Sequence, residues 1–365
     1  MPDEMPEGWR EASFSDLARY DNGRAFKPAD WGSEGLPIVR IAQITNPDAE
    51  TNRYLGEVED RHRLTNGDLI FSWSATLAVM KWRRGPAVLN QHLFKVTPAA
   101  GIDQDWLQFR LDTSIPDLTE EAHGTTMKHI RKGTLSSQTT FVPPLDEQRR
   151  IAEVLRSVDE AIAASKAVER AVSVVFRRRR HDLIEQARGC SSEVAVASAL
   201  GKNRGEKLTK LQTEQYDVAG RYPIVDQGAR FVCGYTDDEG ALWPYNLPVV
   251  VFGDHTRILK FVDFPFAIGA DGTQCLTPAA GIRPRYLYYA LQSLDLRAEG
   301  YARHFKLLKE KTIPIPTPDD QLSIEEELFS IEVAELEARD STLKLETLKI
   351  ALSSELLSGR VRVPA

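Results

Sequence analysis

The side chains that catalyse reactions occur in this 365-residue sequence without the spacings of known catalytic motifs. It contains no GxxxxGK(S/T) phosphate loop, no HExxH zinc motif and no GxSxG nucleophile elbow. Residues Val142–Leu145 (VPPL) contain the two prolines of an adenine methyltransferase motif but lack its acidic and aromatic residues. Asp254 and His255 could form part of a hydrolytic site, but no nucleophile stands beside them. The sequence therefore predicts a protein without a catalytic site of its own.

Charge is unevenly distributed along the chain. A net charge of −7 and a pI near 5.7 lack the basic character that is usual for nucleic-acid binders. Thr317–Ala365 holds eleven acidic and five basic residues, a net −6, so the remainder is close to neutral. The rest of the chain can therefore still present basic surfaces to phosphate. Its length allows two or three domains, each with a core.

Nothing in the sequence points to a membrane, an exported protein or a metal cluster. Apolar stretches such as Leu247–Phe252 are far shorter than the roughly 20 residues of a membrane span. Met1–Arg10 is acidic and contains proline, unlike a signal peptide. Cys190, Cys233 and Cys275 form an odd set without CxxC spacing, which favours free thiols. We expect a folded cytoplasmic protein that does not bind membranes.

The sequence contains an internal duplication. Thr97–Ile102 (TPAAGI) recurs as Thr277–Ile282, a shift of 180 residues. Related segments recur in the same order around each copy, first a Pro-Ile-Val strand and then an aromatic-rich helix. These pairs are Leu36–Val39 with Tyr222–Val225, and Trp106–Leu111 with Tyr286–Leu291. The period is about half the chain, which indicates a duplicated module and not a solenoid.

Each half is predicted to be a mixed α+β unit followed by a long helix. Short β-branched and aromatic runs are separated by turns, as where Asn66–Asp68 precedes Leu69–Phe71. Prolines end each unit, because proline interrupts a strand ladder but is tolerated at a helix start. They are Pro143 and Pro144 in the first half, and Pro314, Pro316 and Pro318 in the second.

The segments after these prolines have the spacing of long packed helices. Every fourth and third residue from Ile151 to Leu183 forms an apolar stripe with three polar interruptions, and a similar stripe runs from Ile324 to Leu356. About 40 residues in a helix span on the order of 60 Å. The two helices could dimerise the protein or form an internal antiparallel pair with the two globular units at opposite ends.

Several strings resemble the specificity subunits of Type I restriction-modification systems, and together they extend over essentially the whole chain. In the first half these are Gly67–Ser74 (GDLIFSWS), Leu89–Val96 (LNQHLFKV) and Val142–Ala152 (VPPLDEQRRIA). In the second half they are Tyr222–Gly228, Val249–Thr256, Pro265–Gly269 and Leu356–Val363.

This resemblance implies an α+β fold with a pseudo-two-fold repeat and two mixed α/β target-recognition domains. Two long antiparallel helices, a coiled-coil spacer, would separate the domains. The expected boundaries are 1–143 and 189–316 for the domains, and 144–188 and 317–365 for the helices. Each domain would read one half of a split double-stranded DNA site, and the rigid helices would set the unread gap.

The resemblance also implies partners and a division of chemistry among them. Two methyltransferase subunits would dock on the helical regions, and restriction or translocase subunits could join them. S-adenosylmethionine, magnesium and ATP would bind to these partners and no cofactor to this chain. The docking residues that match the family pattern are Pro143, Pro144, Glu147, Gln148, Ile151 and Leu155. Pro316–Gln321 matches that pattern only loosely, which leaves the second docking surface less defined.

Loops rich in groups that pair with base edges are the candidate DNA contacts that the resemblance suggests. Gln and Asn can hold adenine, and Arg or Lys can hold guanine, each pair contributing about 1–3 kcal/mol of discrimination. The candidates in the first domain are Arg40, Gln43, Ser72, Trp73, Asn90, Gln91, His92, Lys128, His129, Arg131 and Lys132. Those in the second are Asp226, Gln227, Asp254, His255, Thr256, Arg257, His304 and Lys306.

Structural roles compete with these assignments. Asn90–His92 and Gly253–Thr256 could be turns whose side chains bond their own backbone. We interpret three tryptophans as core residues in preference to base-stacking platforms: Trp73, Trp82 and Trp106. Arg177–Arg180 could grip phosphate, remain solvated or pair with acidic residues of the second helix such as Glu325–Glu327, and we favour pairing.

Two other functions remain open at this stage. The acidic run Asp117–Glu121 could bind a metal in a nuclease, which predicts DNA cleavage by the purified chain alone. A protein-only scaffold would use the helices to bridge partners and would show no salt-sensitive DNA binding.

Overall fold

Two compact units make up the chain. The computed structural model describes residues 5–46, 48–120, 130, 132–201, 208–296 and 303–363. Unit 1 consists of Met1–Ser165 and Ser341–Ala365, and unit 2 consists of Lys166–Asp340. Unit 2 is therefore an insertion between two segments of unit 1.

The described part of unit 1 contains two four-stranded sheets and one separate strand pair. Its strands are β1 (Arg10–Ser13), β2 (Ala18–Asn22), β3 (Leu36–Val39), β4 (Arg53–Tyr54), β5 (Arg63–Leu64), β6 (Leu69–Ser72), β7 (Ala78–Lys81), β8 (Ala87–Leu89), β9 (Leu93–Pro98) and β10 (Thr139–Val142). One sheet has the antiparallel order β2-β9-β6-β7, and the other has the order β4-β3-β8-β5, with β3 and β8 parallel. β1 pairs with β10, so the first strand lies beside the segment that leads to the long helix.

Short helices complete unit 1. They are α1 (Phe14–Leu17), α2 (Ile41–Thr45), α3 (Gln104–Glu120) and α4 (Lys132–Ser137), with 3-10 turns at Pro28–Asp30 and Asp60–His62. The first residues of α5 (Leu145–Cys190) and the last of α9 (Pro318–Ser358) pack into the same core as α3, in which Trp106 is fully buried. That core also contains Ile151, Leu155 and Leu356.

The described part of unit 2 repeats most of this arrangement. Its strands are β11 (Ser192–Ala195), β12 (Tyr222–Val225), β13 (Gly234–Thr236), β14 (Val249–Gly253), β15 (Leu259–Val262), β16 (Ala267–Ile268), β17 (Thr273–Leu276) and β18 (Thr312–Ile315). They form the sheets β15-β14-β17 and β13-β12-β16 and the pair β11-β18. Its short helices are α6 (Val196–Ala199), α7 (Pro284–Gln292) and α8 (His304–Glu310), with 3-10 turns at Thr213–Gln215 and Glu239–Ala241.

Strand pairing confirms the duplication that the hexapeptide predicts. The parallel pair β12 and β16 corresponds to β3 and β8, and the antiparallel pair β11 and β18 corresponds to β1 and β10. The bridge between Ala18 and Pro98 recurs between Leu200 and Pro278. Both units are mixed α+β structures, as predicted.

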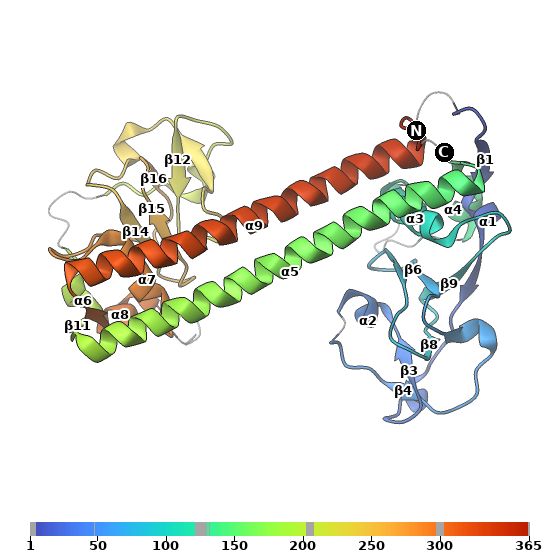
Figure 1. Cartoon of the computed structure of the whole chain (residues 1–365), viewed down its shortest axis with the longest axis horizontal. Coiled ribbons are helices and arrows are strands. Elements are labelled where there is room, and N and C mark those ends of the chain that lie inside the picture. The colour runs from blue at the N-terminus through green and yellow to red at the C-terminus, as the bar shows by residue number, and fades with distance from the viewer. Residues whose placement is uncertain are drawn as a thin grey trace. The chain divides into compact units, whose positions relative to one another are not determined.

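The two long helices are α5 (Leu145–Cys190) and α9 (Pro318–Ser358), and they lie side by side in Figure 1. None of the residues of the two predicted stripes is exposed, whereas the residues between them mostly are. The stripe on α5 packs Ile151 and Leu155 into the core of unit 1, and Phe176 and Leu183 into that of unit 2. Helix periodicity in the sequence therefore located the buried faces correctly.

Within each unit the two helical segments run antiparallel. In unit 1, Lys349 Nζ lies 2.7 Å from Asp159 Oδ1, and Ser165 Oγ lies 2.9 Å from Thr342 Oγ1. In unit 2, Arg179 Nη2 donates to Glu327 Oε2 over 3.0 Å. The internal antiparallel pair is thus the arrangement within each unit, and Arg179 pairs with the acidic helix as expected.

Helix α9 ends at Ser358, before the end of the predicted helical region. Gly359 adopts a φ of +77°, a left-handed conformation that terminates helices and favours glycine. The chain then turns back along the start of α5. Arg362 Nη2 donates to Glu147 Oε2 over 2.8 Å, and Trp9 Nε1 donates to the same oxygen over 3.0 Å. The carboxylate of Glu147 therefore joins both ends of unit 1 to α5.

A buried glutamine at matched places ties each long helix to the turn after the hexapeptide strand. Gln148 Nε2 donates to Gly101 O at 3.1 Å and to Pro143 O at 2.9 Å, while its Oε1 accepts Asp103 N at 2.7 Å. Gln321 makes the same three bonds, to Gly281 O, Pro316 O and Arg283 N, at 3.1, 2.9 and 2.8 Å. We call these two sets of bonds the glutamine clamps.

Replacing Gln148 by leucine is expected to lower the free energy of unfolding of unit 1 by about 3 kcal/mol. The change leaves three backbone groups without their partner, and an unsatisfied buried group costs about 1–3 kcal/mol. Chemical denaturation monitored by circular dichroism measures the effect. Gln104→Leu, which removes a single side-chain bond to Gly67 O, serves as control and should cost no more than about 1 kcal/mol. Equal effects of the two changes would contradict the clamp.

Candidate nucleic-acid interface

In unit 1, Arg40 lies where the parallel strands β3 and β8 end together. Asn90 N donates to Val39 O over 3.0 Å, so Arg40 and Asn90 follow adjacent strand ends. Arg40 Nη1 donates to Asn52 Oδ1 over 2.8 Å, and its guanidinium carbon lies 4.5 Å from the centre of the Trp31 ring. Burial lowers the pKa of Arg40 below its usual value. The side chain is therefore held in place by an amide and an aromatic ring.

The Asn90–His92 segment combines a turn with two exposed side chains. Asn90 is buried, and its Oδ1 accepts His92 N over 3.3 Å, which supports a turn role for this residue. Gln91 and His92 are exposed, with Nε2 atoms 3.2 Å apart. The Trp73 ring is half-buried, with its centre 5.9 Å from that of His92. Gln91 and His92 thus remain available for contact with a ligand, and Trp82 and Trp106 are core residues as expected.

Two other candidates of unit 1 face inward. Gln43 is 4% exposed and bonds both ends of its own segment: its Oε1 accepts Arg40 N at 3.0 Å, and its Nε2 donates to Glu50 O at 2.8 Å. Ser72 is fully buried, and its Oγ donates to Thr76 O over 2.6 Å. These two buried side chains therefore stabilise the loops by bonding backbone atoms, and they are not exposed to a ligand. Lys128, His129 and Arg131, together with the side chain of Lys132, lie outside the described residues.

In unit 2, the structure brings loops that are distant in sequence together after β12 and β14. Gln227 Oε1 accepts His255 N over 3.2 Å, and Thr256 Oγ1 donates to Gln227 O over 2.5 Å. Asp226 Oδ1 accepts Gly228 N over 2.7 Å. Gln227, His255 and Thr256 from the two loops therefore lie together and form one surface.

Asp254 joins this surface to the start of α8. Its Oδ1 accepts Phe305 N over 2.7 Å, and its backbone oxygen accepts His304 N over 3.0 Å. Both Asp254 and His304 are buried, at 6% and 2% exposure. Asp254 thus bonds another segment and not its own turn, contrary to the turn interpretation.

Two cations of unit 2 lie at the edge of this surface. Arg257 has a φ of +62°, and its Nη1 donates to Leu296 O over 2.7 Å. Lys306 is exposed on α8. Sequence reasoning missed Trp31, which is 45% exposed over Arg40 in unit 1, and Lys260, a buried lysine beneath the Asp226 loop. No sequence pattern shows that a lone lysine or tryptophan packs beside a particular loop.

The docking residues that match the family pattern lie mostly in the core of unit 1. Gln148, Ile151 and Leu155 are at most 1% exposed, and Glu147 is 3% exposed and paired with Arg362. Pro143 is also buried, whereas Pro144 is exposed. These side chains fix the start of α5, so a partner would have to contact the residues around them.

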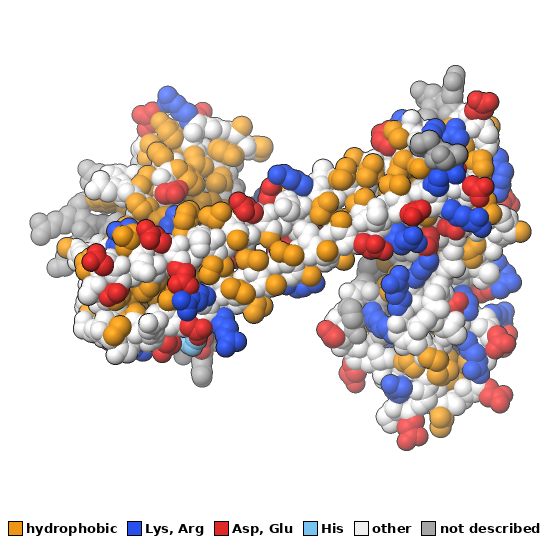
Figure 2. All heavy atoms as spheres, viewed as in Figure 1, with side chains coloured by type: hydrophobic (Ala, Val, Ile, Leu, Met, Phe, Trp, Pro, Cys, Tyr) orange, Lys and Arg blue, Asp and Glu red, His pale blue; other side chains and the backbone are white. Residues whose placement is uncertain are grey.

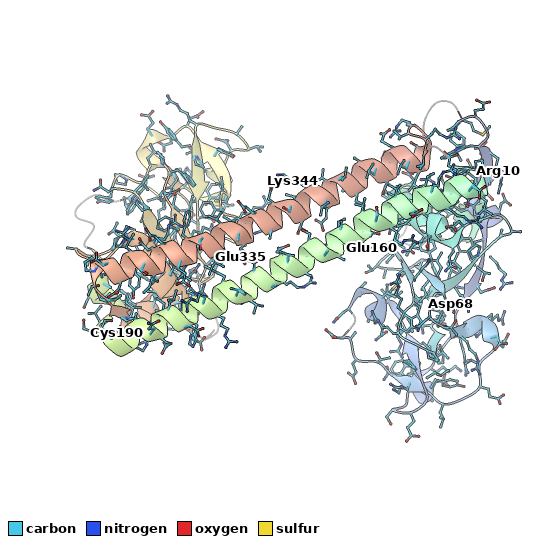
Figure 3. All side chains as sticks on the ribbon, viewed as in Figure 1. Arg10, Asp68, Glu160, Cys190, Glu335 and Lys344 are labelled. Carbon is cyan, nitrogen blue, oxygen red and sulfur yellow. The ribbon has the colours of Figure 1, made fainter. Side chains whose placement is uncertain are left out.

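The described residues offer no evident site for a metal or a membrane. Among them, no group of three His, Cys, Asp or Glu side chains is placed to hold a metal ion. No helix within the described ranges is long and apolar enough to cross a membrane. None of the three cysteines, all within the described ranges, forms a disulfide, as predicted, and Cys190 ends α5 (Figure 3).

The two α+β units repeat one frame, and each has loops that follow its pair of parallel strands. Residues 6–172 match the family model described as the Type I restriction modification DNA specificity domain. The chain is similar to Type I specificity subunits, the resemblance that its sequence predicts.

Two named relatives are similar to the chain. The chain is 24% identical over 216 residues to the Type I restriction enzyme EcoBI specificity subunit of Escherichia coli, a match covering 58% of this chain and 44% of that protein. It is 22% identical to the MjaVIII specificity subunit of Methanocaldococcus jannaschii, over 98% and 94% of the two chains. The chain thus matches less than half the length of the EcoBI subunit.

The fold is also shared with a solved structure. The S subunit of a Type I restriction-modification system from M. genitalium superposes with a TM-score of 0.64 at 14% identity, over 98% of this chain and 97% of that one. At this identity the likeness concerns the fold alone.

Replacing Asp254 by alanine is expected to destabilise unit 2 by about 2 kcal/mol, since a hydrogen bond to a charged group contributes about 1.5–3 kcal/mol. Lys306→Ala, on the same surface but exposed, should change stability by less than about 0.5 kcal/mol. Urea denaturation followed by tryptophan fluorescence distinguishes the two. A neutral Asp254→Ala would show that this carboxylate does not hold the loop.

Proposed function

We propose that this chain reads a bipartite double-stranded DNA sequence and directs methyltransferase subunits to it. Unit 1 reads one half-site and unit 2 reads the other. The observation that carries this proposal is the repeated loop surface, which follows the parallel strands of both units and presents different side chains in each. One frame with two sets of side chains suits a protein that recognises two different short sequences.

The chemistry of modification belongs to partner subunits in this proposal. The chain supplies sequence recognition, and the partners bind S-adenosylmethionine and methylate adenine. Restriction subunits that use magnesium and ATP can join the same assembly. The boundaries 1–143, 144–188, 189–316 and 317–365 describe the two readers and the two helical regions in this division of labour.

Exposed apolar side chains on the long helices support partner docking. On α9, Leu322, Phe329, Leu336, Leu343 and Ile350 recur every seven residues, and their exposure ranges from 37% to 73%. We call this set the outer stripe. Figure 2 shows apolar side chains along both long helices, and Figure 3 labels Glu335 and Lys344 on α9, the sequence neighbours of Leu336 and Leu343. Heptad spacing flanked by charges is typical of a helix that receives another helix.

Methylation mapping tests the proposed function. DNA from cells that carry this gene together with those of its partner subunits should contain methylated adenines in a split motif. Cells that lack only this chain should lose them, because the partners would no longer find the sequence. Single-molecule sequencing provides the readout. Methylation that persists without the chain would refute the proposal, and DNA cleavage by the purified chain alone would favour the nuclease alternative.

Charging the outer stripe is expected to prevent partner binding. Leu336→Glu combined with Leu343→Glu would place two carboxylates in an apolar interface, and co-purification of methyltransferase subunits should fall at least about tenfold, since burying an unpaired charge is costly. Ala334→Glu with Ser341→Glu adds the same charge at exposed positions outside the stripe and serves as control. Undiminished binding by the first variant would place the docking surface elsewhere.

A further inference from the structure

The two units diverge directly after one matched strand. Gly269 N donates to Val225 O over 3.0 Å, as Asn90 N does to Val39 O, so β12 and β3 end at equivalent places. After β3 the chain enters α2, whereas after β12 it forms a loop that leads to β13. We call residues 226–233 the β12–β13 loop. Structure that is the same in both units cannot distinguish two half-sites. The segment after β12, which differs from the segment after β3, is therefore a candidate for reading bases.

Lys260 anchors both ends of the first turn of this loop. It lies on β15 and is 4% exposed. Its Nζ donates to Asp226 O over 2.7 Å and to Arg230 O over 2.5 Å, and lies 3.8 Å from Asp226 Oδ1. Burial lowers the pKa of Lys260 below its usual value, while Asp226 counteracts this effect. Burying an ammonium is costly unless it is paired, so these acceptors hold the loop in one conformation.

The carboxylate of Asp226 completes the base of the loop. Its Oδ1 accepts Gly228 N over 2.7 Å, and its Oδ2 accepts the Tyr216 hydroxyl over 3.2 Å. Tyr216 in turn lies over Gly269, where an added Cβ would collide with the hydroxyl. Buried polar groups therefore fix the base of the loop on several sides.

The tip of the loop carries an arginine and an aromatic ring toward solvent. Phe231 is 46% exposed, with its ring centre 6.0 Å from that of Phe264. Arg230 is exposed, and within the described ranges its guanidinium has no hydrogen-bond or ion-pair partner. The bonds of Gln227 to the 255–256 segment place this loop beside the rest of the candidate interface.

We propose that Arg230 reads a guanine in the half-site bound by unit 2 and that Phe231 packs against the adjacent nucleotide. Lys260 is the positioning residue for both. Arginine matches the O6 and N7 acceptors of guanine with two parallel hydrogen bonds, and apolar rings pack against or between bases. This inference rests on the proposed function, because it names which base and which side chains are involved.

Substitution of Arg230 tests the base contact by methylation mapping with the partner subunits present. In Arg230→Ala, one position of one half-site should lose roughly ten- to hundred-fold of its preference for guanine, the discrimination that one bidentate contact supplies. Arg230→Gln should shift that position toward adenine, since glutamine pairs with the N6 and N7 of adenine. Arg221→Ala, a change of an exposed arginine of the same unit that pairs with Glu239, should leave the motif unchanged.

A second variant identifies the half-site and separates base reading from a phosphate contact. His92→Ala in unit 1 should affect only the half-site that Arg230 variants leave intact. If Arg230 touched phosphate instead, binding would weaken equally on all sequences, and the salt dependence of binding would fall by about one charge. That result would overturn the inference.

Lys260→Met tests the positioning role. The variant should relax several positions of the half-site bound by unit 2, while the other half-site and the gap remain, an effect that general destabilisation would not produce. If this buried change prevents folding, Phe231→Ala tests the same loop from the surface and should lower preference at the position next to that of Arg230. An unchanged motif in Arg230→Gln would overturn the inference but leave the proposed function intact. Absence of chain-dependent methylation in the wild type would refute both.

Discussion

The glutamine clamps are the constraint on which the rest of the structure depends. In each clamp, one glutamine side chain donates to two backbone carbonyls. One carbonyl belongs to the turn after the hexapeptide strand, and the other belongs to the proline that precedes the long helix. The two helices have 46 and 41 residues, so a small change in the direction of the helix at its first turn would displace its last residues by a large distance. Three hydrogen bonds from one buried amide remove that freedom. The same clamp occurs in both units, so each helix leaves its unit in the same local geometry.

Above this common base, the two units use their polar residues in two ways. One group, which includes Gln43, Asp254 and Lys260, is buried and bonded to backbone atoms, near in sequence for Gln43 and distant for the other two. A second group is exposed: it includes Gln91 and His255 on loops and Lys306 on α8. Burial of the first group costs desolvation free energy. Hydrogen bonds offset this cost only when every donor and acceptor of the group has a partner. This division allows the exposed residues to change without loss of the frame.

Much of the fold could be predicted from the sequence because its signals were periodic or repeated. The duplicated hexapeptide gave the two units, and the stripe from Ile151 to Leu183 gave the buried face of α5. The candidate site was harder, because burial of a polar side chain depends on partners far away in the chain. For Asp254 the sequence left a base contact and a turn role open, whereas its partner in the structure, Phe305, lies 51 residues further on. Gly359 is a local sequence signal for the end of α9. Whether a glycine ends a helix depends on its φ angle, which the sequence does not give.

The insertion of unit 2 within unit 1 has a consequence for synthesis on the ribosome. Residues 166–340 are contiguous, so unit 2 has all of its chain as soon as those residues have emerged. Unit 1 must wait for its last segment, since Leu356 and Leu357 belong to its core and Arg362 pairs with Glu147. The part that is translated first therefore completes its structure last. A premature stop near the end of the message would damage unit 1 and leave unit 2 whole.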